Sequence, residues 1–290
     1  MRVDLLAGTT YNPAVMPAPV PTILVFDSGL GGLTVFSELL KARPDARFVY
    51  AADDAAFPYG RLTEEALVER VLAVMERLIG LYDPELVVVA CNTASTLVLP
   101  HLRERFATPF VGTVPAIKPA ALTTRTGHVT VLATPGTVAR DYTRDLVETY
   151  AAGCRVKLVG SRRLAGFAEA ELAGSPVSDE EIVAELQPCF VEDEAGRTDV
   201  VALGCTHYPL LLSRFQKLAP WPVTWIDPAP AIAKRVVQLI GAPVPGHEAD
   251  ENEAMAVFTG GQGIGAALRN ALSEKGLPLV LVEDMPLLQG

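Results

Sequence analysis

Short apolar runs alternate with longer amphipathic stretches from residue 22 onward, and this alternation limits the possible folds more than any other feature. Most of the runs are continuously apolar and rich in β-branched residues, which is typical of parallel strands covered on both faces. The pattern predicts an α/β fold with open, doubly wound parallel sheets. The expected strands are Ile23–Phe26, Phe48–Ala51, Leu86–Ala90, Phe110–Gly112, Val129–Ala133, Val156–Val159, Val200–Leu203, Val223–Ile226, Ala256–Phe258 and Leu279–Val282.

The stretches between these runs have the apolar spacing of amphipathic helices. Gly80 directly follows one of them and is interpreted as a helix stop. The expected helices are Leu33–Ala42, Thr63–Ile79, Ala94–Phe106, Thr137–Tyr150, Asp179–Phe190 and Pro228–Ile240.

A chain of 290 residues has the length of about two domains. LVVVACNT at Leu86–Thr93 and VVALGCTH at Val200–His207 each place a cysteine just after a buried strand. We interpret them as a weak internal repeat, although any α/β protein contains several similar strand–turn–helix joints. The expected first domain comprises residues 22–116 plus 226–290, and the second comprises residues 117–225. Residues 1–21 contain four prolines and are expected to form a flexible leader.

Charge and cysteine usage exclude several classes of protein. The 24 Lys and Arg residues against 34 Asp and Glu residues give a net charge of −10, which argues against nucleic-acid or anionic-membrane partners. The four cysteines are widely spaced, so a zinc ribbon, an iron–sulfur run and a disulfide scaffold are not expected. Free thiols, together with no recognisable signal peptide or membrane span, predict a cytoplasmic protein. We found no metal signature and no lysine in a recognisable cofactor-binding context.

Two of the cysteines lie in settings that favour chemistry. Cys91 precedes Asn92 and Thr93, while Cys205 precedes Thr206 and His207. A thiol beside a helix N-terminus is expected to have a lowered pKa, and His207 could tune the second thiol or carry its proton. The alternative is that such cysteines only pack as small apolar residues, which is the commoner case. We assign Cys154 and Cys189 to packing.

Three turns are also candidates. Asp27 ends the first strand before a glycine-rich turn, where it could cap a helix, hold a cationic amino group or transfer a proton. The segment Asp53–Gly60 could present Tyr59 to the same edge, although an ordinary surface turn is the better explanation when the segment is taken alone. Gly261–Ala266 matches a dinucleotide pattern, but too little chain follows for the rest of that unit.

Two thiols on opposite sides of one cleft could act as a pair of bases. One would take a proton from a carbon and the other would return a proton to the opposite face, which inverts the stereocentre. Two other classes remain open. A cysteine hydrolase or amidotransferase would pair Cys205 with His207, or Cys91 with a distant histidine, and a binding protein would catalyse no reaction.

The motifs of this chain resemble the glutamate racemase family of the aspartate/glutamate racemase superfamily. The motifs occur in the family's order, and the two cysteine motifs together are specific. They are DSGLGG at Asp27–Gly32, PYG at Pro58–Gly60, ACNTAS at Ala90–Ser95, VPA at Val114–Ala116, TPGTV at Thr134–Val138 and LGCTHYPLL at Leu203–Leu211.

This resemblance implies cofactor-independent interconversion of L- and D-glutamate, which supplies peptidoglycan synthesis and so supports cell-wall biogenesis and cell shape. It also implies two α/β domains related by a pseudo-two-fold axis, an active site in the interdomain cleft and a homodimer. In the family the first thiol acts on the D-isomer and the second on the L-isomer. Aspartate racemases of the same superfamily also pair two cysteines and remain an alternative.

The resemblance assigns roles to individual residues as well. Cys91 and Cys205 match the two bases, and Asp27 and His207 match the groups that assist them. The segment GSRRLAGFAEAEL differs from the sequence pattern that is usual in the family. Glu169 within it is the best positional match for a further acid. The implied substrate contacts are Asp27, Ser28, Pro58, Tyr59, Gly60, Asn92, Thr93, Thr134, Thr137, Thr206 and His207.

Overall fold

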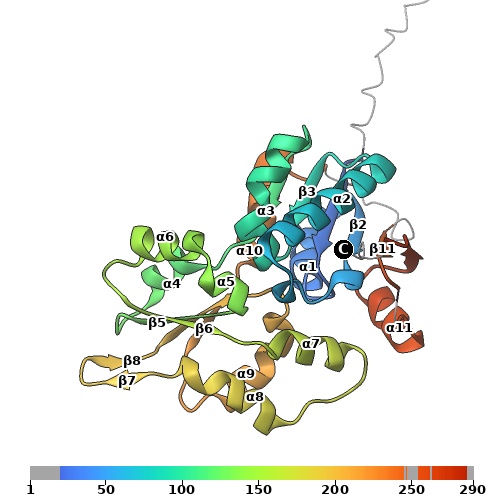
Figure 1. The fold of residues 1–290 in the computed structure, drawn as a ribbon. Coiled ribbons are helices and arrows are strands. Elements are labelled where there is room, and N and C mark those ends of the chain that lie inside the picture. The colour runs from blue at the N-terminus through green and yellow to red at the C-terminus, as the bar shows by residue number, and fades with distance from the viewer. Residues whose placement is uncertain (1–19, 245, 247–253, 262, 286–290) are drawn as a thin grey trace, which may run out of the picture.

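The computed structural model describes residues 20–244, 246, 254–261 and 263–285. Residues 1–19 of the expected leader lie outside this range. Two parallel sheets dominate the described chain (Figure 1). We call the six-stranded sheet with its helices the first unit, and the four-stranded sheet with its helices the second unit.

The six-stranded sheet has the order β12–β11–β2–β1–β3–β4, and all its paired strands are parallel. Strand β1 lies inside this sheet beside β3, the strand that leads into the first cysteine motif. The strands are β1 (Thr22–Asp27), β2 (Arg47–Ala52), β3 (Leu86–Val89), β4 (Phe110–Gly112), β11 (Met255–Phe258) and β12 (Leu279–Val282).

Helices cover both faces of this sheet, as the continuous apolar strands require. One face packs against α1 (Leu33–Ala42), α10 (Ala229–Ile240) and α11 (Ala266–Glu274). The other face packs against α2 (Glu64–Tyr82) and α3 (Asn92–Arg105). Each fully buried Leu or Phe side chain in these two cores stabilises the fold by about 1.5–3 kcal/mol.

The four-stranded sheet has the order β10–β9–β5–β6 and is also parallel. On one face lie α4 (Ile117–Thr123) and α6 (Asp141–Tyr150), and on the other lie α7 (Leu164–Leu172), α8 (Asp179–Leu186) and α9 (Leu212–Leu218). A short helix, α5 (Pro135–Ala139), begins where β5 ends. The strands are β5 (His128–Ala133), β6 (Arg155–Gly160), β9 (Val200–Gly204) and β10 (Thr224–Ile226).

All the expected strands form, which confirms the predicted α/β class. Two expected helices are interrupted. The predicted helix over 137–150 breaks at Arg140, whose backbone is extended at φ −69° and ψ 138°, so α5 and α6 are separate. The helix predicted over 179–190 ends at Leu186 and continues only as a 3-10 turn, Gln187–Cys189, because Pro188 has no N–H to donate.

The predicted stop at Gly80 is wrong. Helix α2 continues through Gly80 to Tyr82, and Asp83 then ends it in a left-handed conformation at φ 43°. Tyr82 packs against the core beside α2, so burial of its ring outweighs the low helix propensity of one glycine. Four helices, α4, α7, α9 and α11, were not predicted at all.

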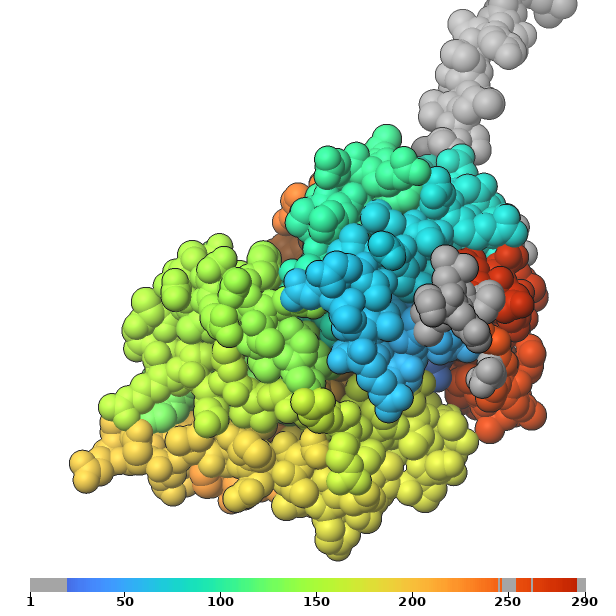
Figure 2. All heavy atoms as spheres, viewed as in Figure 1, coloured from blue at the N-terminus to red at the C-terminus, as the bar shows by residue number. Residues whose placement is uncertain are grey.

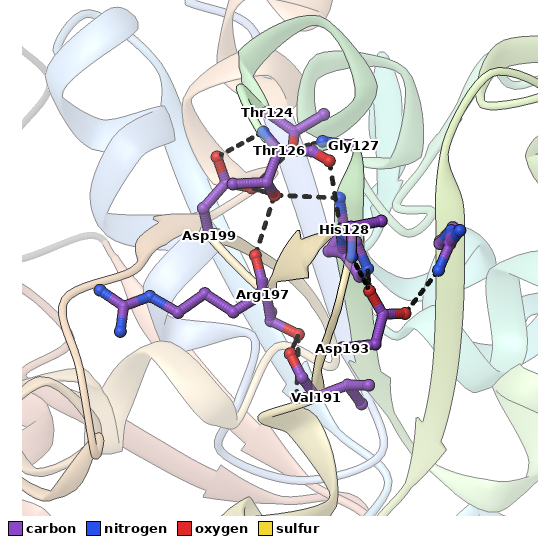
Figure 3. A network of polar contacts seen from close by, with 11 residues as sticks. Thr124, Thr126, Gly127, His128, Val191, Asp193, Arg197 and Asp199 are labelled. Carbon is purple, nitrogen blue, oxygen red and sulfur yellow. Dashed lines mark hydrogen bonds and ion pairs between the residues drawn. The ribbon is translucent and has the colours of Figure 1, made fainter.

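The amino ends of the second unit's strands are joined by a polar network (Figure 3). Asp199 accepts hydrogen bonds from the hydroxyl of Thr124 at 2.5 Å and from the backbone N–H of Arg125 at 2.8 Å. His128 Nε2 contacts Asp193 Oδ1 at 3.2 Å, next to the hairpin of β7 (Glu192–Asp193) and β8 (Gly196–Arg197). This network lies at the opposite end of the strands from the cysteine motif.

Within the described residues, no helix has both the length and the apolar character needed to cross a bilayer.

Candidate active site

The polar segments of both units follow the carboxyl ends of central strands, where open α/β sheets bind ligands. Asp27 is the last residue of β1, Cys91 caps α3 just after β3, and Cys205 directly follows β9. Contacts between the units bring these ends together. Leu30 N donates to Glu169 Oε1 at 2.6 Å, and Thr34 Oγ1 donates to the carbonyl of Thr206 at 3.1 Å.

The second unit packs directly against the first along this boundary (Figure 2). Cys91 and Cys205 retain only 5% and 6% of their exposure, so both thiols are enclosed. All four cysteines are free thiols. Cys189 is fully buried in the core of the second unit, and Cys154 packs beside another cluster there.

Cys91 lies in an environment that favours its protonated form. Its Sγ donates to Ser28 Oγ at 3.7 Å. Burial and the negative charge of Asp27 raise the pKa of the Cys91 thiol well above its usual value, and a hydrogen bond from Ala94 N–H only partly opposes them. We expected the N-terminus of α3 to lower this pKa. That expectation is wrong because desolvation outweighs the helix terminus.

Cys205 lies at the end of a chain of polar contacts. His207 Nδ1 lies 3.7 Å from Cys205 Sγ, and His207 Nε2 lies 2.7 Å from Glu169 Oε1. Burial alone would lower the pKa of His207, but the hydrogen bonds to Cys205 and Glu169 and the charge of Asp27 raise it well above its usual value. His207 is therefore more readily protonated than a free imidazole, and its Nδ1 faces the sulfur of Cys205.

The glycine-rich turn after β1 makes room for this chain of contacts. A Cβ on Gly31 would lie 2.3 Å from His207 Nδ1, and a Cβ on Gly29 would lie 2.4 Å from Glu169 Oε1. Gly32 donates its N–H to Asp27 Oδ2 at 2.9 Å. The turn therefore serves packing across the two units, because only glycine lets His207 and Glu169 approach it so closely.

Asp27 and Asn92 carry the polar atoms that have unused hydrogen-bonding capacity. Asp27 is fully buried, and its Oδ1 has no partner within the described residues, although Oδ2 accepts from Gly32. Both amide atoms of buried Asn92 also lack partners there. Burial raises the pKa of Asp27, although positive His207 opposes the shift. Unpaired buried polar groups are costly, so these atoms are suited to hold a polar ligand.

Three threonines join the two units beside Cys91. Thr93 Oγ1 lies 2.9 Å from Thr134 Oγ1 and 3.4 Å from Thr137 Oγ1. Thr134 also caps α5 by accepting from the N–H of Thr137. The structure thus brings the predicted residues of the TPGTV motif next to the first cysteine motif.

The segment around Tyr59 is not an ordinary surface turn, because the Tyr59 side chain is buried. Tyr59 is 1% exposed, and its hydroxyl donates to Asp53 Oδ2 at 2.6 Å. Arg70 donates from Nε to the same oxygen at 3.0 Å, and Thr259 donates to Asp53 Oδ1 at 2.7 Å. The Tyr59 hydroxyl is therefore already engaged by Asp53, while Pro58 and Gly60 on either side of it remain partly or fully exposed.

Some groups at the site were not predicted from the sequence. Thr34 and Phe57 contact the His207 segment from the first unit, with the ring of Phe57 5.5 Å from that of His207. Asp53 and Arg70 fix the turn that holds Tyr59. Of these, Asp53 had a recognisable signal, because it follows a buried strand end just as Asp27 ends one.

The first glycine of the dinucleotide-like turn, Gly261, is bound by a carboxylate of the protein itself. The N–H groups of Gly260 and Gly261 each donate to the carboxylate of Asp54 at 2.8 Å. Within the described range, no cluster of three or more His, Cys, Asp or Glu side chains has the geometry of a metal site.

This geometry defines a pair of enclosed thiols, one from each sheet: Cys91, whose pKa is raised, and Cys205, which lies beside His207. Residues 32–236 match the Asp/Glu/Hydantoin racemase family, and the chain belongs to that family.

The similar proteins within the family are glutamate racemases. The chain is 53% identical to the glutamate racemase of Brucella anthropi over 254 residues, which cover 85% of this chain and 91% of that protein. It is 54% identical to that of Agrobacterium fabrum over 241 residues, covering 83% and 88% of the two chains.

A solved structure of Escherichia coli glutamate racemase, in complex with L-glutamate and the activator UDP-MurNAc-Ala, matches with a TM-score of 0.83. The identity is 40%, and the match covers 93% of this chain and all of that one.

Proposed function

We propose that this chain is a glutamate racemase that interconverts L- and D-glutamate with two thiols and supplies D-glutamate for peptidoglycan. The observation that carries the proposal is the pairing of Cys91 and Cys205, which follow strands of two different sheets and have different neighbours, Asp27 for Cys91 and His207 for Cys205. The identity to glutamate racemases over most of the chain supports glutamate as the substrate.

In the L-to-D direction, Cys205 acts as the base. Its thiolate, beside His207 Nδ1, takes the α-proton of L-glutamate and becomes a thiol. Cys91, kept protonated by burial, gives its own proton to the opposite face of the α-carbon and becomes a thiolate. The product is D-glutamate, and the two thiols have exchanged protonation states. The D-to-L reaction runs the same steps in reverse.

Neutral groups and one aspartate would hold the substrate. The unpaired Oδ1 of Asp27 is suited to the α-ammonium group, because both are buried opposite charges. Asn92 offers both a donor and an acceptor, while Thr93, Thr206 and the backbone near Ser28 offer donors for carboxylate oxygens. Donors fixed in place stabilise the carbanionic character that develops at the α-carbon.

The test is a chirality assay on purified protein with L-glutamate, a chelator and no added cofactor. We expect D-glutamate to accumulate, and Cys91→Ser and Cys205→Ser each to lower the rate by roughly 10²–10⁴-fold. L-aspartate, run in parallel, distinguishes an aspartate racemase. Release of ammonia or hydrolysis without inversion would favour a cysteine hydrolase, and glutamate binding without inversion would favour a binding protein.

Three coarser expectations belong to the same proposal. We propose that the two sheets mark two domains close to the expected bounds, residues 22–116 plus 227–290 and residues 117–226, because Ile226 ends β10 of the second sheet. We also propose a homodimer, which sedimentation equilibrium would detect, and a cytoplasmic location. The four free thiols support the last of these, because a reducing compartment keeps cysteines unpaired.

A further inference from the structure

Phe57 is an aromatic residue with an unexplained position. It lies between two 3-10 turns, Asp54–Ala56 and Tyr59–Arg61, and is only half buried. It is a member of none of the four hydrophobic clusters formed by the described residues. Its ring instead lies 5.5 Å from the ring of His207 in the other unit, with an interplanar angle of 40°.

The glycine-rich turn after β1 lets this ring approach the backbone closely. A Cβ on Gly29 would lie 3.1 Å from Phe57 Cδ2 and 2.4 Å from Glu169 Oε1. The missing side chain at this one position therefore allows both neighbours of His207, the Phe57 ring and the Glu169 carboxylate, to approach. A ring that only filled space on the surface would not need a glycine at position 29.

Hydrogen bonds from other parts of the first unit fix the loop that carries Phe57. Asp53 begins the loop, is fully buried and accepts hydrogen bonds from Tyr59, Arg70 and Thr259. Asp54 accepts the N–H groups of Gly260 and Gly261. These contacts on both sides of Phe57 fix the backbone, so the position of the ring does not depend on its own packing alone.

We propose that Phe57 is a positioning residue for His207. Its ring lies against the His207 ring, excludes water from that side and keeps His207 between Cys205 and Glu169, so that Cys205 can act as the base. This inference rests on the proposed racemase function.

The charges around His207 explain why an aromatic ring suits this position. Cys205 faces it from the segment after β9, Glu169 from α7 and Asp27 from the end of β1. On the Phe57 loop itself, Asp53 is paired with Arg70, and Asp54 is bound by backbone N–H groups. The face of a phenyl ring attracts a cation and adds no further acid, so it favours the imidazolium without competing for its protons.

The test compares three variants by NMR titration of the histidine side chains, with His207 assigned from a His207→Gln spectrum. Phe57→Leu keeps an apolar side chain but removes the ring, Phe57→Tyr keeps the ring, and Phe106→Leu removes a half-buried ring far from the site. We expect Phe57→Leu to lower the pKa of His207 by about 0.5–1.5 units, as the loss of a cation–π contact implies. Phe57→Tyr and Phe106→Leu should leave it near the wild-type value.

Kinetics provide the second readout. The basic limb of the kcat/KM profile should move to lower pH in Phe57→Leu by the same amount, and Phe57→Tyr should restore it. An unchanged His207 pKa in folded Phe57→Leu would overturn the inference, as would an equal shift in Phe106→Leu. Because the titration needs no turnover, it decides the role of Phe57 separately from the wild-type assay that decides the racemase function.

Discussion

At the scale of single residues, the two thiols differ in what surrounds them. Cys91 is enclosed beside Asp27, which raises its pKa, while Cys205 lies 3.7 Å from the imidazole of His207. This asymmetry suits a reaction in which one sulfur takes a proton while the other gives one. It also depends on a crowded arrangement, because His207 lies where any Cβ on Gly31 would have to be.

Replacing Gly31 by alanine tests that crowding. The new Cβ would displace His207, and a misplacement of about 1 Å in a catalytic group lowers activity by about a hundredfold. We expect kcat/KM to fall by at least about that factor while the far-ultraviolet spectrum stays unchanged. Gly80→Ala is the control, because nothing lies within 4 Å of its Cβ position in helix α2. It should keep full activity and gain about 0.5–1 kcal/mol in stability.

Most residues of the candidate site could be proposed from the sequence, because each motif that carries them is local. The cysteines, Asp27 and His207 all lie within short segments beside strand ends. Phe57 was missed because its contact with His207 joins residues 150 positions apart, and no local pattern reports such a contact. The raised pKa of Cys91 was missed for a similar reason, since burial by distant elements outweighed the local helix terminus.

At the scale of secondary-structure elements, strands were easier to predict than helices. The continuous apolar runs, such as Leu86–Val89, form strands because both faces of each sheet are covered. Helix ends were less predictable, since tertiary packing of Tyr82 extended α2 past Gly80. Short helices such as α4 and α9 were missed because seven residues give too few turns for a clear amphipathic period.

The β7–β8 hairpin gives a prediction at this scale. The Ala195 N–H, His128 and Arg155 lower the pKa of Asp193 to about 2. Because this folded-state pKa lies below the ordinary value, the stability contributed by Asp193 is present above about pH 4 and is lost as the pH falls toward 2. Urea unfolding across this range should show that Asp193→Asn is less stable at neutral pH and loses less stability on acidification.

Asp145→Asn, which changes an exposed carboxylate on α6, is the control for this experiment. An unfolding free energy with the same pH dependence in Asp193→Asn as in the wild type would contradict the assignment.

At the scale of the whole molecule, the site is enclosed by contacts between two units. Both thiols are nearly inaccessible, so we expect the two units to move apart when substrate enters. The threonine cluster around Thr93 joins the units, and Arg140, which directly follows α5, forms an ion pair with Glu64 at the start of α2. Glu64 remains largely exposed, whereas Arg140 is mostly buried. This pair therefore favours the closed arrangement from the surface.

Glu64→Gln should make opening easier. Exposed ion pairs contribute about 0.2–1 kcal/mol, so we expect KM to rise about 1.4- to 5-fold because the closed form, which holds substrate, is less favoured. The dependence of kcat on solvent viscosity should weaken, since product release is faster. Glu65→Gln, on the exposed neighbouring position, should change neither quantity. Equal effects in both variants would assign the change to general surface charge.

The most direct test of the two-thiol account is the fate of solvent deuterium during the first turnovers in D₂O. Starting from L-glutamate, the account predicts D-glutamate deuterated at the α-carbon, while the remaining L-glutamate keeps its hydrogen. This follows because Cys205 can return only the proton it removed, and Cys91 supplies the deuteron. Deuterium appearing in the remaining L-glutamate as fast as in D-glutamate would contradict the account, because a single exchanging base would then serve both faces.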